Sequence, residues 1–224
     1  VRRVNFTGST HVGRIIAQTA AKYLKPTVLE LGGKAPFVVL DDADLDAAVN
    51  GAIFGSFANS GQICMSTERI IVDASVADEF VKRFAARAAA LPLGDPRKPD
   101  PVVLGSLVDR SAVERCNALI DDALAKGGKL LCGGKAESTL FAATVIDHVT
   151  PEMRLYREET FGPLKGVVRV NGVEEAIATA NDNEFGLSAA VFGGDLARAW
   201  QVAGRIESGI CHVNGPTVHD EAQM

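Results

Sequence analysis

Segments typical of strands and segments typical of helices alternate along the whole chain, and this order limits the possible folds more than any other feature. Short runs rich in β-branched and aromatic residues, such as residues 35–40 (APFVVL) and 68–74 (ERIIVDA), are separated by longer stretches with apolar side chains at helical spacing. Strands that are separated by helices form a mainly parallel sheet with helices on its faces. We therefore predict an α/β fold.

The individual elements follow this alternation. In the helix predicted at residues 42–59, Leu45 and Phe57 fall near one stripe, and Asp42 is the expected N-cap. In the helix predicted to begin at Ser75, Asp78 follows at the spacing of a capping box. Further helices are predicted at 12–24, 110–126, 173–181 and 196–206, and further strands at 2–8, 27–33, 129–134, 143–149, 163–170, 187–194 and 209–215.

The composition argues against several classes of protein. Of the 224 residues, 47% are hydrophobic, which suits one or two domains with a substantial core. The net charge is −5 and the chain has no basic stripe, so we expect no nucleic-acid partner. No apolar run approaches the roughly 20 residues that span a bilayer, and no signal peptide is recognisable, so we expect no membrane association.

The four cysteines form no CxxC motif and no Cys/His cluster. We therefore expect free thiols in the reducing cytoplasm, without a disulfide framework and without a metal site. The sequence starts at Val1 inside a strand-like segment and reaches Met224 without a closing element. We expect from this that it is part of a longer protein.

Cys64 lies in the polar turn 59–66 (NSGQICMS), directly after a predicted helix. A thiolate in such a turn would be a good nucleophile. The alternative is a partly buried structural thiol, which is the commoner situation for a lone cysteine. Cys116 shares a helical face with apolar residues, and Cys132 and Cys211 lie in strand-like runs, so we expect these three to be packing residues.

Glu30 lies at the end of an apolar strand, in residues 29–34 (LELGGK). Desolvation between Leu29 and Leu31 would raise the pKa of this carboxyl and make it a usable base near neutral pH. The following glycines would allow another backbone or a ligand to approach closely. The alternative is a strand residue that faces solvent.

Two further turns carry weaker signals. Residues 6–13 (FTGSTHVG) run from a strand into a helix, and the N–H groups at such a helix start can surround a phosphate. Residues 158–165 (EETFGPLK) place two acids beside an aromatic ring, a glycine and a proline, just ahead of an apolar strand. Each stretch alone is also compatible with an ordinary turn.

Taken together, these stretches resemble the NAD(P)-dependent aldehyde dehydrogenase superfamily. The resemblance extends over essentially all 224 residues and rests on six motifs in the family's order: FTGSTHVGR, LELGGKAP, GQICMSTER, EETFGPL, NEFGLSAAVF and SGICHVNG. It implies a three-layer, parallel-sheet catalytic domain with a remnant of a Rossmann-like cofactor domain. We expect the cofactor-domain remnant at 1–30, the catalytic domain at 31–212 and a truncated substrate-loop and C-terminal segment at 213–224.

The resemblance also implies roles for the acid and the thiol. Cys64 matches the nucleophile that attacks the aldehyde carbonyl to give a thiohemiacetal and then a thioester. Glu30 matches the general base that activates the hydrolytic water. The backbone N–H of Cys64 would supply half of the oxyanion hole. The expected cofactor is NAD, with NADP as the other possibility.

On the cofactor side, the resemblance assigns Gly8, Ser9 and Val12 to the turn and helix start that hold the pyrophosphate and adenosine. Glu159 matches the carboxylate that accepts hydrogen bonds from the hydroxyls of the nicotinamide-side ribose. Phe161 matches the ring that packs against this ribose and the nicotinamide. The neighbouring acid, residue 158, is expected to be solvated.

The final residues, 204–224, resemble the aromatic branch of the family, whose members act on salicylaldehyde, vanillin or benzaldehyde, with salicylaldehyde as our first choice of substrate. Ile63 and Met65 flank the nucleophile and are expected to contact the ring. Asn214 matches a family asparagine near the active-site loop. The expected substrate loop contains Thr217, Val218 and His219.

The resemblance implies a complete protein about twice as long, with an oxyanion-hole asparagine that has no counterpart in these 224 residues. Two classes of function therefore stay open. One is an active aldehyde dehydrogenase, expected to be a cytoplasmic homo-oligomer that acts on a small aromatic aldehyde. The other is a catalytic-domain fragment with a reactive thiol and at most esterase activity, or a structural or interaction unit. A papain-like Cys–His hydrolase is a poorer third, because no histidine lies in that family's context.

Overall fold

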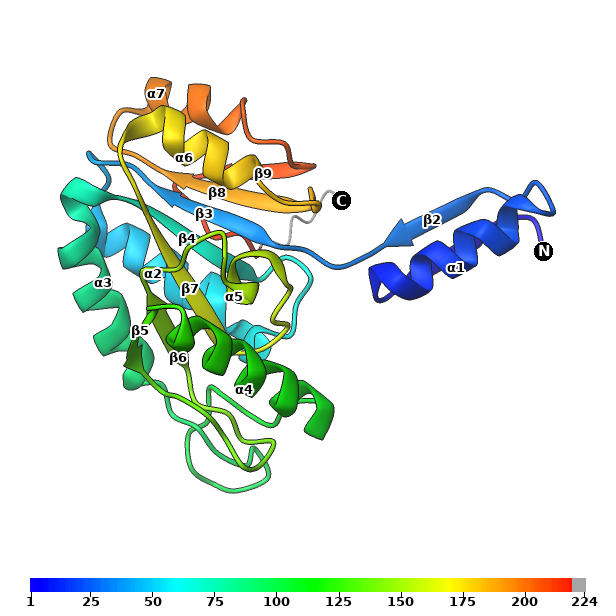
Figure 1. The fold of residues 1–224 in the computed structure, drawn as a ribbon, viewed down its shortest axis with the longest axis horizontal. Helices are drawn as coiled ribbons and strands as arrows, with labels where there is room; N and C mark the ends of the chain where they lie inside the picture. The colour runs from blue at the N-terminus through cyan, green and yellow to red at the C-terminus, as the bar shows by residue number, and fades with distance from the viewer. Residues whose placement is uncertain (219–224) are drawn as a thin grey trace.

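The computed structural model describes residues 1–218 and consists of a small arm and a large α/β body (Figure 1). In the arm, β1 (Val4–Thr7) and β2 (Thr27–Glu30) form a two-stranded parallel sheet, and α1 (Thr10–Ala21) packs against it. A short extended segment then leads from β2 into the body. Strand β2, the last element of the arm, ends at Glu30.

The body is built on a seven-stranded sheet with the order β5-β6-β7-β4-β3-β8-β9. All neighbouring pairs are parallel except β5 with β6, which is antiparallel and lies at the edge. This confirms the predicted parallel sheet. The strands are β3 (Ala35–Val39), β4 (Thr67–Asp73), β5 (Lys129–Cys132), β6 (Thr144–Asp147), β7 (Leu164–Val170), β8 (Ser188–Phe192) and β9 (Ile210–Val213).

Helices cover both faces of this sheet and complete the three layers. Helices α2 (Leu45–Phe57) and α3 (Ala74–Ala89) pack on one face. The other face is covered by α4 (Arg110–Ala125), α5 (Arg154–Arg157), α6 (Gly172–Asn181) and α7 (Leu196–Ala203). The short helices η1 (Ala58–Gly61) and α5 were not predicted, since four residues are too few to show a period.

The position of β3 inside the sheet, between β4 and β8, explains why its sequence is a continuous apolar run. Phe37 and Val39 point into the core on the α2/α3 side, whereas Val38 points into the core on the opposite side. All three side chains are at most 1% exposed. A strand that is buried on both faces needs apolar residues at every position, because successive side chains point to opposite faces.

Two predicted helix caps were wrong. Helix α2 is capped by Asp44, which accepts hydrogen bonds from the N–H groups of Asp46 and Ala47, whereas Asp42 accepts one from Asp195 in the turn before α7. The helix starts two residues later than the pattern indicated. The apolar stripe fixes a helical face but not the residue at which the helix begins.

Helix α3 likewise begins at Ala74 and is capped by Asp73, which accepts a hydrogen bond from the N–H of Ser75. Asp78 forms an ion pair with Arg169 of β7 at 2.6 Å and does not close a capping box. A contact with a residue 91 positions later in the chain could not be read from local spacing. Within residues 1–218, no helix is long and apolar enough to cross a membrane.

Candidate active site

A cleft of about 630 Å³ lies where the arm meets the body. Its walls include the turns that follow β1 and β2 and the turns that precede β4 and β7. Because β7, β4 and β3 are parallel neighbours, the segments that enter them arrive at the same edge of the sheet. Seven of the residues proposed from the sequence line this cleft: Gly8, Ser9, Glu30, Ile63, Cys64, Glu159 and Phe161.

Cys64 lies in the turn between η1 and β4. Residues 59–61 have left-handed backbone conformations, with φ of 49°, 57° and 71°, and the N–H of Ser66 donates to the carbonyl of Ile63 at 2.9 Å. At Asn59 and Ser60 the left-handed conformation costs on the order of 1 kcal/mol per residue, so the surrounding packing must stabilise the turn. The half-buried thiol is thereby presented to the cleft.

The two glycines that follow Glu30 explain how the three turns meet. A Cβ atom on Gly33 would overlap the backbone carbonyl oxygen of Cys64, and a Cβ on Gly32 would lie 2.6 Å from the carboxylate of Glu159. Only glycine leaves room for both neighbours. The close approach expected from the sequence is therefore confirmed, with the turn that contains Cys64 (the Cys64 turn) on one side and the 158–161 turn on the other.

Glu30 is the last residue of β2 and is exposed. The burial that Leu29 and Leu31 led us to expect is not found. Among the described strands β2 pairs only with β1, and its side chains alternate between half-buried and exposed. The carbonyl of Glu30 accepts a hydrogen bond from the N–H of Gly8 at 3.0 Å, which ties the two cleft-lining turns of the arm together.

Glu159 is half-buried, and its carboxylate accepts a hydrogen bond from the N–H of Gly33 at 2.9 Å. Burial raises the pKa of this carboxyl above its usual value, although the Gly33 hydrogen bond acts in the opposite direction. Glu158 is exposed, as expected, and forms a bidentate pair with Arg154 one helical turn earlier. Two adjacent acids therefore have different surroundings.

The start of α1 also faces the cleft. Gly8 and Ser9 line it, and Ser9 is the N-cap of α1, whose hydroxyl accepts from the N–H of Val12 at 3.4 Å. The first N–H groups of a helix carry partial positive charge and suit a phosphate. With the Glu159 carboxylate and the Phe161 ring on the same cleft, these residues fit a dinucleotide.

Four predicted residues are not among those that line the cleft. Val12 lies on the exposed surface of α1, and Met65 is half-buried next to Cys64. The side-chain amide of Asn214 exchanges two hydrogen bonds with the backbone of Gly193 and thereby joins the ends of β8 and β9. Val218 is half-buried at the end of the described chain.

The expected substrate loop is firmly attached at one residue. The Thr217 hydroxyl is buried against that of Thr67 at 2.8 Å, and the Thr217 carbonyl accepts a hydrogen bond from Ser188. His219, which we also expected in this loop, lies outside the described residues. Among residues 1–218, no group of three or more His, Cys, Asp or Glu side chains could hold a metal ion.

The other cysteines are free and behave as packing residues. Burial raises the pKa of Cys116 to about 11, and burial also raises the pKa of Cys211 to about 11. The pKa of the half-buried Cys132 is raised by burial as well. These thiols are therefore protonated and poorly nucleophilic at neutral pH.

Comparison with known proteins agrees with this geometry. The sequence model of the aldehyde dehydrogenase family matches residues 1–224, the whole chain.

The chain belongs to the aldehyde dehydrogenase family.

Relatives within the family include enzymes named for aromatic aldehydes. A vanillin dehydrogenase of Pseudomonas fluorescens is 62% identical over 224 residues, which is 100% of this chain and 46% of the relative. A salicylaldehyde dehydrogenase of Pseudomonas putida is 54% identical over 223 residues, again 100% of this chain and 46% of the relative. The chain thus spans about half the length of the curated relatives it matches.

A solved structure has the same fold. The crystal structure of a salicylaldehyde dehydrogenase from Pseudomonas putida G7 complexed with salicylaldehyde superposes with a TM-score of 0.98 at 54% identity. The superposition covers 100% of this chain and 46% of the salicylaldehyde dehydrogenase chain. The mixed α/β architecture with a parallel sheet is therefore that of the aldehyde dehydrogenases.

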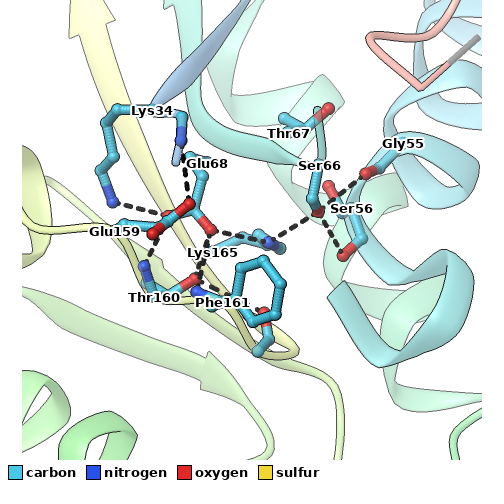
Figure 2. Close-up of polar contacts among 12 residues, drawn as sticks. Lys34, Gly55, Ser56, Ser66, Thr67, Glu68, Glu159, Thr160, Phe161 and Lys165 are labelled. Atoms are coloured by element: carbon cyan, nitrogen blue, oxygen red, sulfur yellow. Dashed lines mark hydrogen bonds and ion pairs between the residues drawn. The ribbon is translucent and has the colours of Figure 1, made fainter. Parts of the chain in front are cut away.

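Sequence reasoning missed a set of buried charges behind the cleft. Lys34, Glu68 and Lys165 are each at most 2% exposed, yet they interact with one another beside the 158–161 turn (Figure 2). A signal was present, because Glu68 and Lys165 are charged residues near the starts of two strand-like sequences that continue with apolar residues. Arg115 of α4 was also missed, although it lines the cleft and donates twice to the Thr160 carbonyl.

Proposed function

We propose that this chain carries the catalytic part of an aldehyde dehydrogenase that oxidises an aromatic aldehyde to the carboxylic acid with NAD or NADP. The observation that carries the proposal is the single cleft that brings together Cys64, Glu30, Glu159 and Phe161 with the start of α1. The division into a cofactor-domain remnant (1–30), a catalytic domain (31–212) and a terminal segment (213–224) belongs to the same proposal.

In the proposed reaction, the Cys64 thiolate attacks the carbonyl carbon, a C–S bond forms, and the carbonyl oxygen becomes an oxyanion near the backbone N–H of Cys64. The dinucleotide, when bound, would accept the hydride that this thiohemiacetal loses. Glu30 then takes a proton from a water molecule, and the water oxygen attacks the resulting thioester. The C–S bond breaks, the acid leaves, and the thiolate is restored.

The exposure of Glu30 is compatible with this role, because a base for hydrolysis must exchange protons with water. Gly8, Ser9 and Val12 would hold the pyrophosphate and adenosine side of the dinucleotide, and Glu159 and Phe161 would hold the nicotinamide-side ribose. Ionised acceptors form the stronger hydrogen bonds, which suits the Glu159 carboxylate for two ribose hydroxyls.

An aromatic substrate is proposed because the vanillin and salicylaldehyde dehydrogenases are 62% and 54% identical to this chain. These identities favour the aromatic branch and do not favour salicylaldehyde over vanillin. Ile63, Met65, Asn214 and Val218 remain proposed contacts for the ring, together with the loop that contains Thr217. Ile63 is the member of this set that lines the cleft.

A homo-oligomeric assembly and a cytoplasmic location complete the proposal. The second is supported by the four free cysteines, which persist most readily in a reducing compartment.

The proposal is tested by the absorbance of reduced nicotinamide when the chain is mixed with vanillin or salicylaldehyde and with NAD or NADP. Turnover with any of these pairs supports the dehydrogenase. Hydrolysis of 4-nitrophenyl acetate without cofactor, combined with no aldehyde oxidation, would instead favour the second candidate, a unit that keeps the reactive thiol alone. That candidate is retained because the Cys64 side chain lines the cleft.

A further inference from the structure

A cluster of buried charges lies directly behind the turn that carries Glu159 and Phe161 (Figure 2). Lys34 is the residue before β3, and Glu68 and Lys165 lie in β4 and β7. Their side chains are 0%, 2% and 0% exposed, respectively. Burial of three charged groups is costly, so the arrangement calls for a physical reason.

The Glu68 carboxylate binds the backbone of the turn. It accepts hydrogen bonds from the Thr160 N–H at 2.9 Å, from the Thr160 hydroxyl at 2.6 Å and from the Phe161 N–H at 3.2 Å. Phe161 has a left-handed backbone, with φ of 45°, which a bulky residue adopts only when its surroundings impose it. The carboxylate thus fixes a strained turn at two successive amides.

The two lysines hold this carboxylate in place. Lys34 donates to Glu68 at 2.8 Å and to the Glu158 carbonyl at 2.6 Å, and Lys165 lies 3.6 Å from Glu68. Burial alone would raise the pKa of the Glu68 carboxyl, but the two ammonium groups bring its pKa below the usual value. Glu68 is therefore ionised at neutral pH.

The same cluster is also hydrogen-bonded to the Cys64 turn. Lys165 donates to the Ser66 hydroxyl at 3.1 Å, and Ser66 donates to the Gly55 carbonyl of α2 at 3.0 Å. Ser66 closes the turn that contains Cys64 through its N–H bond to Ile63. The 158–161 turn and the Cys64 turn are therefore connected by one network of buried polar groups (Figure 2).

We propose that Glu68 is a positioning residue, which orients Glu159 and Phe161 for the dinucleotide through its hydrogen bonds to the backbone of residues 160 and 161. The inference rests on the proposed function, since it concerns the same cleft. Glu68 itself is not a cleft-lining residue, whereas Glu159 and Phe161 are. It acts through the turn, and neither Lys34 nor Lys165 lines the cleft either.

The test compares Glu68→Gln with Asp147→Asn in the full chain. Asp147 is an equally suitable carboxylate for removal, since it is 3% exposed and pairs with Arg169 at 2.8 Å, but it lies in β6 and contacts no residue of the 158–161 turn. Both variants lose a buried charge pair and some stability. Only Glu68→Gln loses the anchor of the turn.

Two readouts separate positioning from stability. Hydrogen–deuterium exchange of the unliganded chain is expected to accelerate at residues 158–163 in Glu68→Gln and to stay as in wild type there in Asp147→Asn. Calorimetric titration with NAD is expected to show binding about tenfold weaker in Glu68→Gln and unchanged in Asp147→Asn, because a hydrogen bond to a charged group contributes about this factor. Alkylation of Cys64 by iodoacetamide without cofactor reports on the thiol separately.

If Glu68→Gln does not fold, Thr160→Val removes the hydroxyl donor without touching a charge, and Thr160→Ser should restore wild-type NAD binding. Unchanged exchange at 158–163, or NAD affinities that fall equally in Glu68→Gln and Asp147→Asn, would overturn the inference. For the threonine pair, equal NAD affinities in Thr160→Val and wild type would do so. A wild-type chain that binds neither NAD nor NADP would overturn the proposed function and this inference together.

Discussion

At the scale of single residues, four thiols of one chain have different surroundings. Cys64 faces a cleft of about 630 Å³, whereas Cys116 and Cys211 have pKa values raised to about 11 by burial. The thiolate is the nucleophilic form of cysteine, so burial that raises the pKa of a thiol makes it a poorer nucleophile, and Cys64 is the cysteine that lines the cleft.

We therefore predict that Cys64→Ala abolishes both aldehyde oxidation and ester hydrolysis. Circular dichroism and the thermal midpoint should stay close to those of wild type, because the turn is held by backbone bonds and not by the thiol. Cys211→Ser is the matched control and should keep its activity. If Cys211→Ser lost activity while Cys64→Ala retained it, the assignment of Cys64 as the nucleophile would be wrong.

Glu30→Gln tests the proposed base. Water activation matters for hydrolysis of the thioester and less for hydride loss, so we expect a burst of reduced cofactor followed by a slow steady state. The steady-state rate should fall by about 10²–10⁴-fold, the usual contribution of a general base. Stopped-flow absorbance measures both phases. A steady state equal to that of wild type would exclude this role.

Glu159→Gln should weaken NAD binding and lower oxidation, since misplacement by even about 1 Å can cost on the order of 10²-fold in rate. Iodoacetamide labelling of Cys64 without cofactor should hardly change. Glu158→Gln is the neighbouring control, because the Glu158 side chain is exposed and pairs with Arg154. Equal effects of the two variants would contradict the proposed ribose contact.

The same carboxyl predicts a pH dependence. Burial raises the pKa of Glu159 above the usual 4.5, and the ionised carboxylate is the stronger acceptor for two hydroxyl hydrogen bonds. NAD affinity should therefore be full well above the raised pKa and should fall as the pH drops through it, at a higher pH than for a solvated glutamate. Calorimetric titrations across this range in wild type and Glu159→Gln check this, because the dependence should vanish in the variant.

At the scale of elements, the site depends on turns that approach one another too closely for any side chain. Gly33 meets the backbone carbonyl of Cys64, although the two residues lie in turns that lead into different strands. Neighbouring parallel strands β3 and β4 bring these turns to one edge of the sheet. The spacing of the strands thus sets the spacing of the side chains that line the cleft.

We predict that Gly33→Ala displaces the Cys64 turn. The added methyl group overlaps backbone, which cannot move away as a flexible side chain does, so destabilisation of about 1–3 kcal/mol is expected. Iodoacetamide labelling of Cys64 should change together with the unfolding midpoint in urea. Gly105→Ala is the control, since a Cβ there meets nothing within 4 Å. Wild-type labelling and stability in Gly33→Ala would show that the contact is unimportant.

At the scale of the whole molecule, the arm carries apolar surface that residues 1–218 leave uncovered. A groove of about 400 Å³ is lined by Val4, Ile15, Ile16 and Tyr23 together with their neighbours, and Ile15 and Tyr23 are 51% and 70% exposed. The sheet of the arm has only two strands, so each has an open edge. Apolar patches and open edges of this kind favour association.

We predict that the chain self-associates through the arm at tens of micromolar protein. Ile15→Lys should reduce the average mass measured by light scattering. Trp200→Lys is the control, because Trp200 is an exposed apolar residue at 64% on α7, in the body. A monodisperse monomer in wild type would contradict the prediction, and equal effects of both variants would place the contact elsewhere.

The sequence by itself determined the class of fold and the family, and it is the source of the proposal for the reacting groups. Alternating strands and helices dictate a parallel sheet, and the runs around Cys64, Glu30 and Glu159 are specific enough to indicate the family. These features are local, because a strand pattern or a catalytic motif is complete within a few residues. Their prediction needs no knowledge of what lies across the molecule.

The tertiary structure decided what depends on distant neighbours. Asp44 and not Asp42 caps α2, Glu30 is exposed despite its leucine neighbours, and Asn214 is bound to Gly193. The Glu68 carboxylate accepts a hydrogen bond from the N–H of Thr160, which is 92 positions later in the chain. Burial and hydrogen bonding are set by packing between elements, and a linear sequence does not state which elements will meet.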